Sequence, residues 1–105
     1  MSEYKIIPFL PEFEERLVNG QKTATTRMKK YGNVGDLFSA LNHTFQITKV
    51  EKVYLGDVAS QSFDKEGFAS QSDFMECWRR LHPKRNRYDT IVYYHEFKRL
   101  VWRTI

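Results

Sequence analysis

Apolar residues at helical spacing mark the first predicted element of this chain. Phe13 and Leu17 lie four positions apart and therefore fall on one face of a helix. Pro11 suits the first turn of such a helix, and Gly20 suits the position just past its end. The pattern predicts a short helix that begins near Pro11 and ends before Gly20.

A second helical pattern precedes Pro83, which would end the helix. Ser70 and Asp73 have the spacing of a capping box at its beginning. Its apolar residues recur at helical spacing, and we interpret them as core: Phe74, Cys77, Trp78 and Leu81. A further short helix is predicted over residues 57–63.

β-branched and aromatic residues predict strands in the rest of the chain. The predicted strands are residues 23–28, 37–41, 45–55, 90–98 and a short one at 100–102. Asn42 and His43 mark a hairpin turn. Phe45 and Ile47 share one face of the long strand whereas Val50 lies on the other, so we expect a β-bulge or cover on both sides.

Strands dominate this pattern, and they do not alternate regularly with helices as in a parallel α/β sheet. We therefore predict an α+β fold built on a small mixed β-barrel with two or three short helices. A ferredoxin-like sandwich is the alternative. At 105 residues, 41% of them hydrophobic, the chain can bury one core, so a single domain over residues 1–105 is expected.

Composition excludes several classes of protein. No apolar run approaches the roughly 20 residues of a membrane span, and the first residues lack a signal peptide's apolar segment, so we expect a soluble, cytoplasmic monomer without membrane contact. The single cysteine, Cys77, allows no internal disulfide. His43, His82 and His95 are scattered and lack metal-ligand spacing, so each is interpreted as a surface or hydrogen-bonded histidine. No metal or cofactor is expected.

Basic residues are clustered in this chain, whose net charge is +4. Lys29 and Lys30 form one cluster. The other has five positive side chains within nine residues: Arg79, Arg80, Lys84, Arg85 and Arg87. Such clusters can bind a polyanion such as RNA or a phosphorylated ligand, but they can equally be a solvated face.

The candidate chemistry lies in the eight residues from Gly20 to Arg27. A lysine ammonium has a pKa of roughly 10.4 in water, but burial or a neighbouring cation can lower that pKa until the amine serves as a base. Lys22 is the candidate base, and Arg27 is close enough in sequence to be the neighbouring cation. Thr25 offers a hydroxyl. The alternative is a strand whose threonines reflect β-propensity and whose charged side chains are solvated.

These motifs together resemble the ASCH family, the activating signal cointegrator homology domains, which are similar in fold to PUA RNA-binding barrels. The resemblance rests on Gly20-x-Lys22-x-x-Thr25-x-Arg27, Gly35-Asp36, the Glu66-Gly67-Phe68 loop and the flanking elements, over about residues 6–100. Small single-domain members of this family are amidohydrolases that remove the acyl group from 4-acetylcytidine and related cytosines. The resemblance implies that Lys22, Thr25 and Glu66 are the catalytic residues.

In this hypothesis neutral Lys22 takes the proton from Thr25, which attacks the acyl carbonyl, and Glu66 holds the lysine or relays a proton to the leaving amine. Water could replace Thr25 as the nucleophile. Lys22 and Thr25 have opposite parity on a strand, so they meet only if Lys22 lies in the turn before it. Further candidates for substrate contact are Arg27 and Thr23, with Pro8, Phe9, Tyr31, Phe68 and Tyr93 for the pyrimidine face.

Two other functions fit the resemblance. A PUA-like module could bind RNA through the basic residues 79–87 without turnover. Some members of the family look like metal-assisted ribonucleases. Intact Lys22, Thr25 and Glu66 favour the hydrolase.

Overall fold

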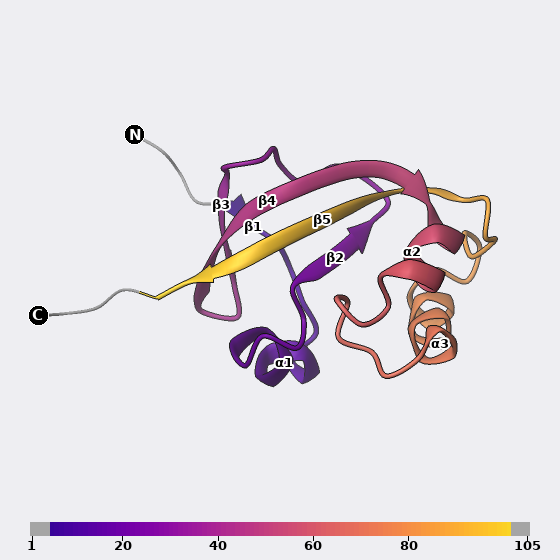
Figure 1. Cartoon of the computed structure of the whole chain (residues 1–105), viewed down its shortest axis with the longest axis horizontal. Helices are drawn as coiled ribbons and strands as arrows, with labels where there is room; N and C mark the ends of the chain where they lie inside the picture. The colour runs from indigo at the N-terminus through magenta and orange to yellow at the C-terminus, as the bar shows by residue number, and fades with distance from the viewer. Residues whose placement is uncertain (1–4, 102–105) are drawn as a thin grey trace, which may run out of the picture.

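The computed structural model describes residues 5–101 (Figure 1). In chain order the elements are β1 (Lys5–Ile6), the 3-10 turn η1 (Pro11–Phe13), α1 (Glu14–Val18), β2 (Ala24–Arg27), β3 (Leu37–Ala40), β4 (His43–Tyr54), α2 (Leu55–Gln61), α3 (Gln71–Leu81) and β5 (Ile91–Leu100). The predicted α+β class is therefore confirmed.

The five strands form one mixed sheet in the order β1-β3-β4-β5-β2. β1 pairs with β3 in parallel, and every other pair is antiparallel. β4 and β5 are the long curved ribbons of Figure 1. Among the strands within residues 5–101 no pairing joins β1 to β2, so the sheet is open at these two edges and barrel closure is not confirmed. Five strands in this order also do not fit the ferredoxin-like alternative.

The middle of β4 contains the expected irregularity. The register with β5 shifts between Ile47 and Lys49, which leaves Thr48 as the extra residue. An extra residue reverses the alternation of side chains beyond it. Val50 therefore packs, half-buried, against the same core as Phe45 and Ile47.

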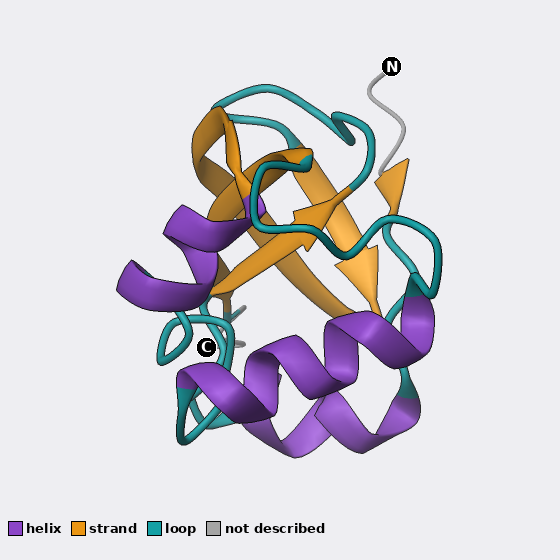
Figure 2. Ribbon diagram, turned by 90° about the vertical axis from the view of Figure 1, so that its right-hand side faces the viewer, coloured by secondary structure: helices purple, strands orange, loops and turns teal. Residues whose placement is uncertain are grey.

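The core has two parts. In the first, the rings of Phe38, Phe45 and Phe97 pack with centroids 5.2–5.4 Å apart, and Leu17 of α1 joins them. The second part lies where α2 and α3 pack beside each other against the far end of the sheet (Figure 2). Phe68 packs against both parts. The loop that carries Phe68 thus lies at the junction between them.

Helix α3 begins as predicted, because the Ser70 hydroxyl accepts a hydrogen bond from the backbone N–H of Asp73 at 3.0 Å. Cys77 is buried, in agreement with its predicted packing role. Leu81 differs from the prediction: it is the last residue of the helix and is 52% exposed. None of the helices within residues 5–101 has the length and apolar character needed to span a bilayer.

Several element boundaries differ from the prediction. α2 begins at Leu55 rather than at residue 57. The hairpin turn is made by Leu41 and Asn42, both with positive φ, and His43 already belongs to β4. β5 continues to Leu100, so the separate strand predicted over 100–102 begins inside β5, and its last residue lies outside the described part.

Candidate active site

A cavity of about 520 Å³ opens between β2, the loop that follows α2, the C-terminal end of α3 and the segment before η1. Its lining combines aromatic rings with a few polar groups, which is typical of a small-molecule site. Of the residues predicted from the sequence, this cavity contains Lys22, Thr25, Arg27, Glu66, Pro8, Phe9, Tyr31 and Phe68.

Lys22 reaches the cavity from the segment just before β2. This is the position that its parity relative to Thr25 required. Its backbone N–H donates to the carbonyl of Arg16 at 2.9 Å, which joins the segment to α1. The N–H groups of Thr23 and Ala24 both donate to the carbonyl of Lys65, at 2.7 and 3.0 Å. These bonds fix the lysine segment beside the loop that carries Glu66.

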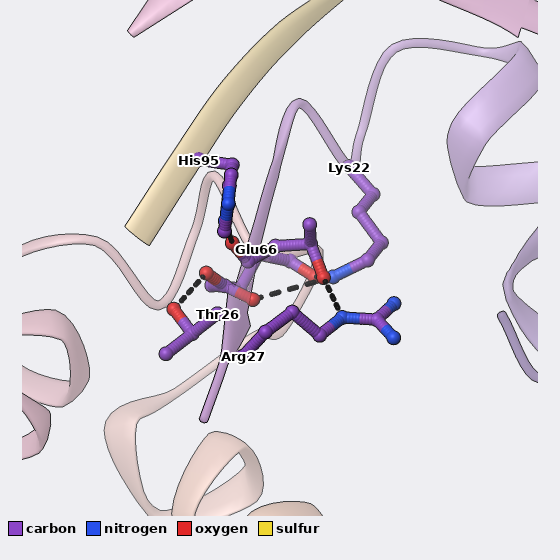
Figure 3. Close-up of polar contacts among 6 residues, drawn as sticks. Lys22, Thr26, Arg27, Glu66 and His95 are labelled. Atoms are coloured by element: carbon purple, nitrogen blue, oxygen red, sulfur yellow. Dashed lines mark hydrogen bonds and ion pairs between the residues drawn. The ribbon is translucent and has the colours of Figure 1, made fainter. Parts of the chain in front are cut away.

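Glu66 contacts Lys22 directly (Figure 3). The Lys22 Nζ donates to the Glu66 backbone carbonyl at 2.8 Å and to Oε1 of its carboxylate at 3.3 Å. Both side chains are only 4% exposed. Gly67 permits this approach: its φ is +93°, and an added Cβ would lie 3.1 Å from the Cβ of Lys22.

The surroundings of the amine lower its pKa. The rings of Phe9, Phe13 and Phe68 lie with centroids 5.0–6.0 Å from Nζ, and their cation–π attraction opposes this effect by favouring the ammonium. Burial lowers the pKa of Lys22 from its ordinary 10.5, and the positive charge of Arg27 lowers it further, whereas the Glu66 carboxylate acts in the opposite direction. Burial is the largest of these effects.

Thr26 is a site residue that the sequence analysis missed. Its hydroxyl donates to Oε2 of Glu66 at 2.7 Å, so the carboxylate is held by Lys22 on one oxygen and by Thr26 on the other (Figure 3). The sequence offers two adjacent threonines, and its only signal was the position of Thr25 within the family motif. Which threonine touches the carboxylate depends on where a loop forty residues later is placed.

Arg27 and Thr25 lie on the same side of β2, as their parity predicts. The Arg27 Nε donates to Oγ1 of Thr25 at 3.0 Å. The guanidinium carbon lies 4.6 Å from the ring centre of Phe9 and 5.5 Å from that of Tyr31, within cation–π range. Within residues 5–101 no carboxylate forms a salt bridge with Arg27, so the alternative role in a strand-ordering ion pair has no support.

Other sequence-predicted residues lie elsewhere. Thr23 precedes β2 and lines a separate hollow beside Phe45 and Phe97, although it has the parity of Thr25 and Arg27, and it is absent from the lining of this cavity. Tyr93 is also absent from the cavity lining. The predicted nucleic-acid-binding residues are exposed and outside this cavity: Arg79, Arg80, Lys84, Arg85 and Arg87.

His95 was interpreted from the sequence as a surface or hydrogen-bonded histidine, without a link to the site. It is completely buried on β5 opposite Thr25, where its Nε2 lies 3.1 Å from the backbone N of Tyr31 and its Nδ1 lies 3.3 Å from the carbonyl of Thr25. Burial lowers its pKa below the ordinary 6.5. Of the two interpretations of this histidine, the hydrogen-bonded one is correct. Across residues 5–101 no group of three His, Cys, Asp or Glu side chains is placed to hold a metal ion.

The fold is similar to several solved structures. It matches an ASCH domain from Lactobacillus crispatus with a TM-score of 0.69 and 16% identity, over 91% of this chain and 79% of that one. It matches an ASCH protein from Zymomonas mobilis with a TM-score of 0.66 and 14% identity, over 89% and 67% of the two chains. It matches a protein from Enterococcus faecalis with a TM-score of 0.73 and 16% identity, over 95% of this chain and 82% of that one.

No family model and no curated protein matches the sequence. The resemblance inferred from the motifs is nevertheless confirmed at the level of the fold by the solved structures. The chain has an ASCH-type fold.

Proposed function

We propose that the protein is an amidohydrolase that removes the acyl group from N4-acylated cytosines such as 4-acetylcytidine. The observation that carries this proposal is a buried lysine with a lowered pKa that shares one aromatic-walled cavity with a threonine and a carboxylate. A perturbed titratable group in a cleft, with a specific charged partner, is a candidate for catalysis. The substrate class follows from the family resemblance.

The hydrogen bonds of Lys22 suit a base. A neutral amine has two N–H donors and one lone pair. The Glu66 carbonyl and Oε1 provide one acceptor for each donor. The lone pair is then left to accept a proton from the Thr25 hydroxyl, or from a water that Thr25 orients, when substrate is bound.

Arg27 supports the nucleophile. Its Nε–H already points at Oγ1 of Thr25, so negative charge that develops on this oxygen is stabilised by a charge-assisted hydrogen bond. The oxygen attacks the acyl carbon and the C–N4 bond breaks, while the proton on Lys22 passes to the departing amine, directly or through Glu66. Water then hydrolyses the threonine ester, with Lys22 again as the base.

The cavity suits a planar ring. Its volume of about 520 Å³ falls within the range of roughly 300–1,000 Å³ that is common for small-molecule sites. The rings of Phe9, Phe68 and Tyr31 supply apolar walls. Arg27 donates through Nε to Thr25 and also lines the cavity, so the terminal nitrogens of its guanidinium are available to donate to acceptor atoms of a ligand.

The test is conversion of 4-acetylcytidine to cytidine by the purified, chelator-treated protein, followed by absorbance. Lys22→Met, Lys22→Arg and Glu66→Gln should each reduce kcat/KM by about 10²-fold or more, because each removes a proton-transfer group. Arginine keeps the positive charge but cannot act as a base at ordinary pH.

The matched control is Lys52→Arg, on the exposed part of β4, which should leave the rate unchanged. Full activity of Lys22→Arg would exclude the lysine as the base. An inactive wild-type protein would exclude the hydrolase.

The second candidate is RNA binding without turnover. Leu81 and His82 line the cavity, and the exposed basic residues of the 79–87 segment flank them on both sides in sequence. A polyanion bound there would contact phosphates, and its affinity would fall steeply with salt. Removing the five positive charges should then abolish RNA binding, whereas the hydrolase should retain its activity at high salt.

A further inference from the structure

His95 connects the two segments that flank Arg27. It lies on β5 directly opposite Thr25 of β2, and its side chain is completely buried. The ring, which is labelled in Figure 3, bridges the Thr25 carbonyl and the backbone N–H of Tyr31, a residue of the loop after β2. It is absent from the cavity lining, so any effect on the reaction must act through other residues.

The two partners define the tautomer of the ring. A backbone N–H can only donate, so Nε2 must present its lone pair to Tyr31. A carbonyl can only accept, so the proton must be on Nδ1, facing Thr25. The neutral Nδ1–H tautomer satisfies both contacts, whereas an Nε2–H ring would place two donors against each other at Tyr31.

Both anchors of His95 are neighbours of Arg27. The Tyr31 ring packs against the guanidinium at 5.5 Å and makes an edge contact with the His95 ring at 6.4 Å between centroids. Thr25 accepts the Arg27 Nε–H at 3.0 Å. If the Tyr31 backbone moved, the guanidinium would lose one of its two flanking rings while Thr25 remained in the strand.

We propose that His95 is a positioning residue whose Nδ1–H tautomer presents an unprotonated Nε2 to the Tyr31 N–H, which ties the Tyr31 loop to β5 beside β2 and thereby holds Arg27 on the Thr25 hydroxyl. The hydrogen bond from Arg27 to Thr25 is thus already formed before substrate binds. The expected effect on the rate of hydrolysis rests on the proposed hydrolase function, whereas the expected position of Arg27 does not depend on that function.

NMR on the wild-type protein tests the geometry without any substrate. The imidazole 15N shifts of His95 should show a protonated Nδ1 and an unprotonated Nε2, and a scalar coupling across the hydrogen bond should link Nε2 to the Tyr31 amide nitrogen. The Arg27 Nε–H should exchange slowly with solvent in wild type and faster in His95→Asn. A ring protonated on Nε2, or unchanged Arg27 exchange in His95→Asn, would overturn the proposal.

Two amide substitutions separate the contacts of the ring. The Gln side chain places its oxygen near the position of Nε2 and can accept from Tyr31, whereas the shorter Asn can replace only Nδ1 and donate to Thr25. We expect His95→Asn to lower kcat/KM for 4-acetylcytidine by about tenfold or more, because the reacting groups lose their alignment. His95→Gln should stay within about threefold of wild type.

Circular dichroism and thermal unfolding confirm that each variant is folded. Equal activity of His95→Asn and wild type, or equal damage in both variants, contradicts the positioning role. If His95→Asn does not fold, the proposal is still tested by the tautomer of His95 in the wild-type protein and by the kcat/KM of His95→Gln. If the wild-type protein hydrolyses nothing, the hydrolase proposal fails, and Arg27 exchange alone decides the role of His95.

Discussion

At Lys22 two electrostatic effects oppose each other. Burial penalises the ammonium form, and the contact with Glu66 favours it. Removing a charge from water costs more than an ion pair returns unless the pair is fully hydrogen-bonded. Burial is the larger effect here, so the pKa of Lys22 lies below 10.5.

The pH dependence of kcat/KM should report this lowered pKa. Because neutral Lys22 is the base, the rate should rise with pH along an acid limb whose midpoint lies below 10.5. Arg27→Gln removes a positive charge that lowers the lysine pKa, so the limb should move to higher pH. A limb that stays in place in Arg27→Gln would show that another group is titrating.

The same pKa affects stability with a definite sign. The unfolded chain, with a lysine pKa near 10.5, binds more protons than the folded one between the two pKa values, so the free energy of unfolding should rise with pH in that window. In Lys22→Met this increase should disappear. Urea titrations of both proteins at a series of alkaline pH values measure the difference, and parallel curves would contradict it.

Gly67 provides a test of the close contact between loop and lysine. Gly67→Ala should cost about 1–2 kcal/mol because of its positive φ and should also displace Lys22. Gly35→Ala is the matched control, since its φ is +94° and an added Cβ meets nothing within 4 Å. Urea unfolding should show a similar loss in both, whereas only Gly67→Ala should lose hydrolysis. Equal activities would mean that the contact has no effect.

For individual residues, the sequence predicts which ones belong to the candidate site better than it predicts the contacts between them. Lys22, Thr25, Arg27 and Glu66 were identified from one motif and one loop, and the structure brings them to one cavity. The Thr26 contact was not predictable, because nothing in a pair of adjacent threonines says which one meets a distant carboxylate. The link of His95 to the site was missed because its role comes from the strand opposite it.

Among the elements, α3 is the one whose signals agree most completely. Its amphipathic spacing, its Ser70 cap and its proline stop all point to the same helix. β1 is the opposite case: it has two residues, both exposed, and exists because β3 offers it an edge. Such a strand leaves no local pattern to detect.

The Ser70 cap of α3 should make a measurable contribution to the free energy of unfolding. Ser70→Ala should lower the free energy of unfolding by about 1 kcal/mol, because the Asp73 N–H loses its partner. Ser72→Ala is the control, since Ser72 is exposed within the same helix and should change stability by less than about 0.5 kcal/mol. Urea unfolding compares the two, and equal values would show that the cap contributes nothing.

For the whole molecule, one cluster of rings in the core stabilises the fold without lining the cavity. The Phe38, Phe45 and Phe97 rings lie within the first part, and none of the three lines the cavity. Phe38→Ala should cost about 3–5 kcal/mol but should leave kcat of the folded fraction near its wild-type value. Denaturant unfolding and active-site titration check this, and a proportional loss of kcat would show that this cluster of rings is coupled to the cavity.

Strand content was predictable at this scale, but closure of the sheet was not. Side-chain alternation shows which residues face a core, and the bulge near Val50 even indicated curvature. Whether the edge strands meet depends on twist accumulated over the whole sheet, which leaves no mark on any single segment. In the structure β1 and β2 remain at opposite edges.

The shared carbonyl of Lys65 has one more consequence. Because two successive amides of the chain, those of Thr23 and Ala24, bind this one oxygen, the backbone beside the amine is anchored independently of the amine itself. The substitution Lys22→Ala should therefore leave a cavity in place of the lysine side chain without displacing the residues around it. A small alkylamine added to the medium could occupy it and restore turnover, with an efficiency that follows the amine's size and basicity.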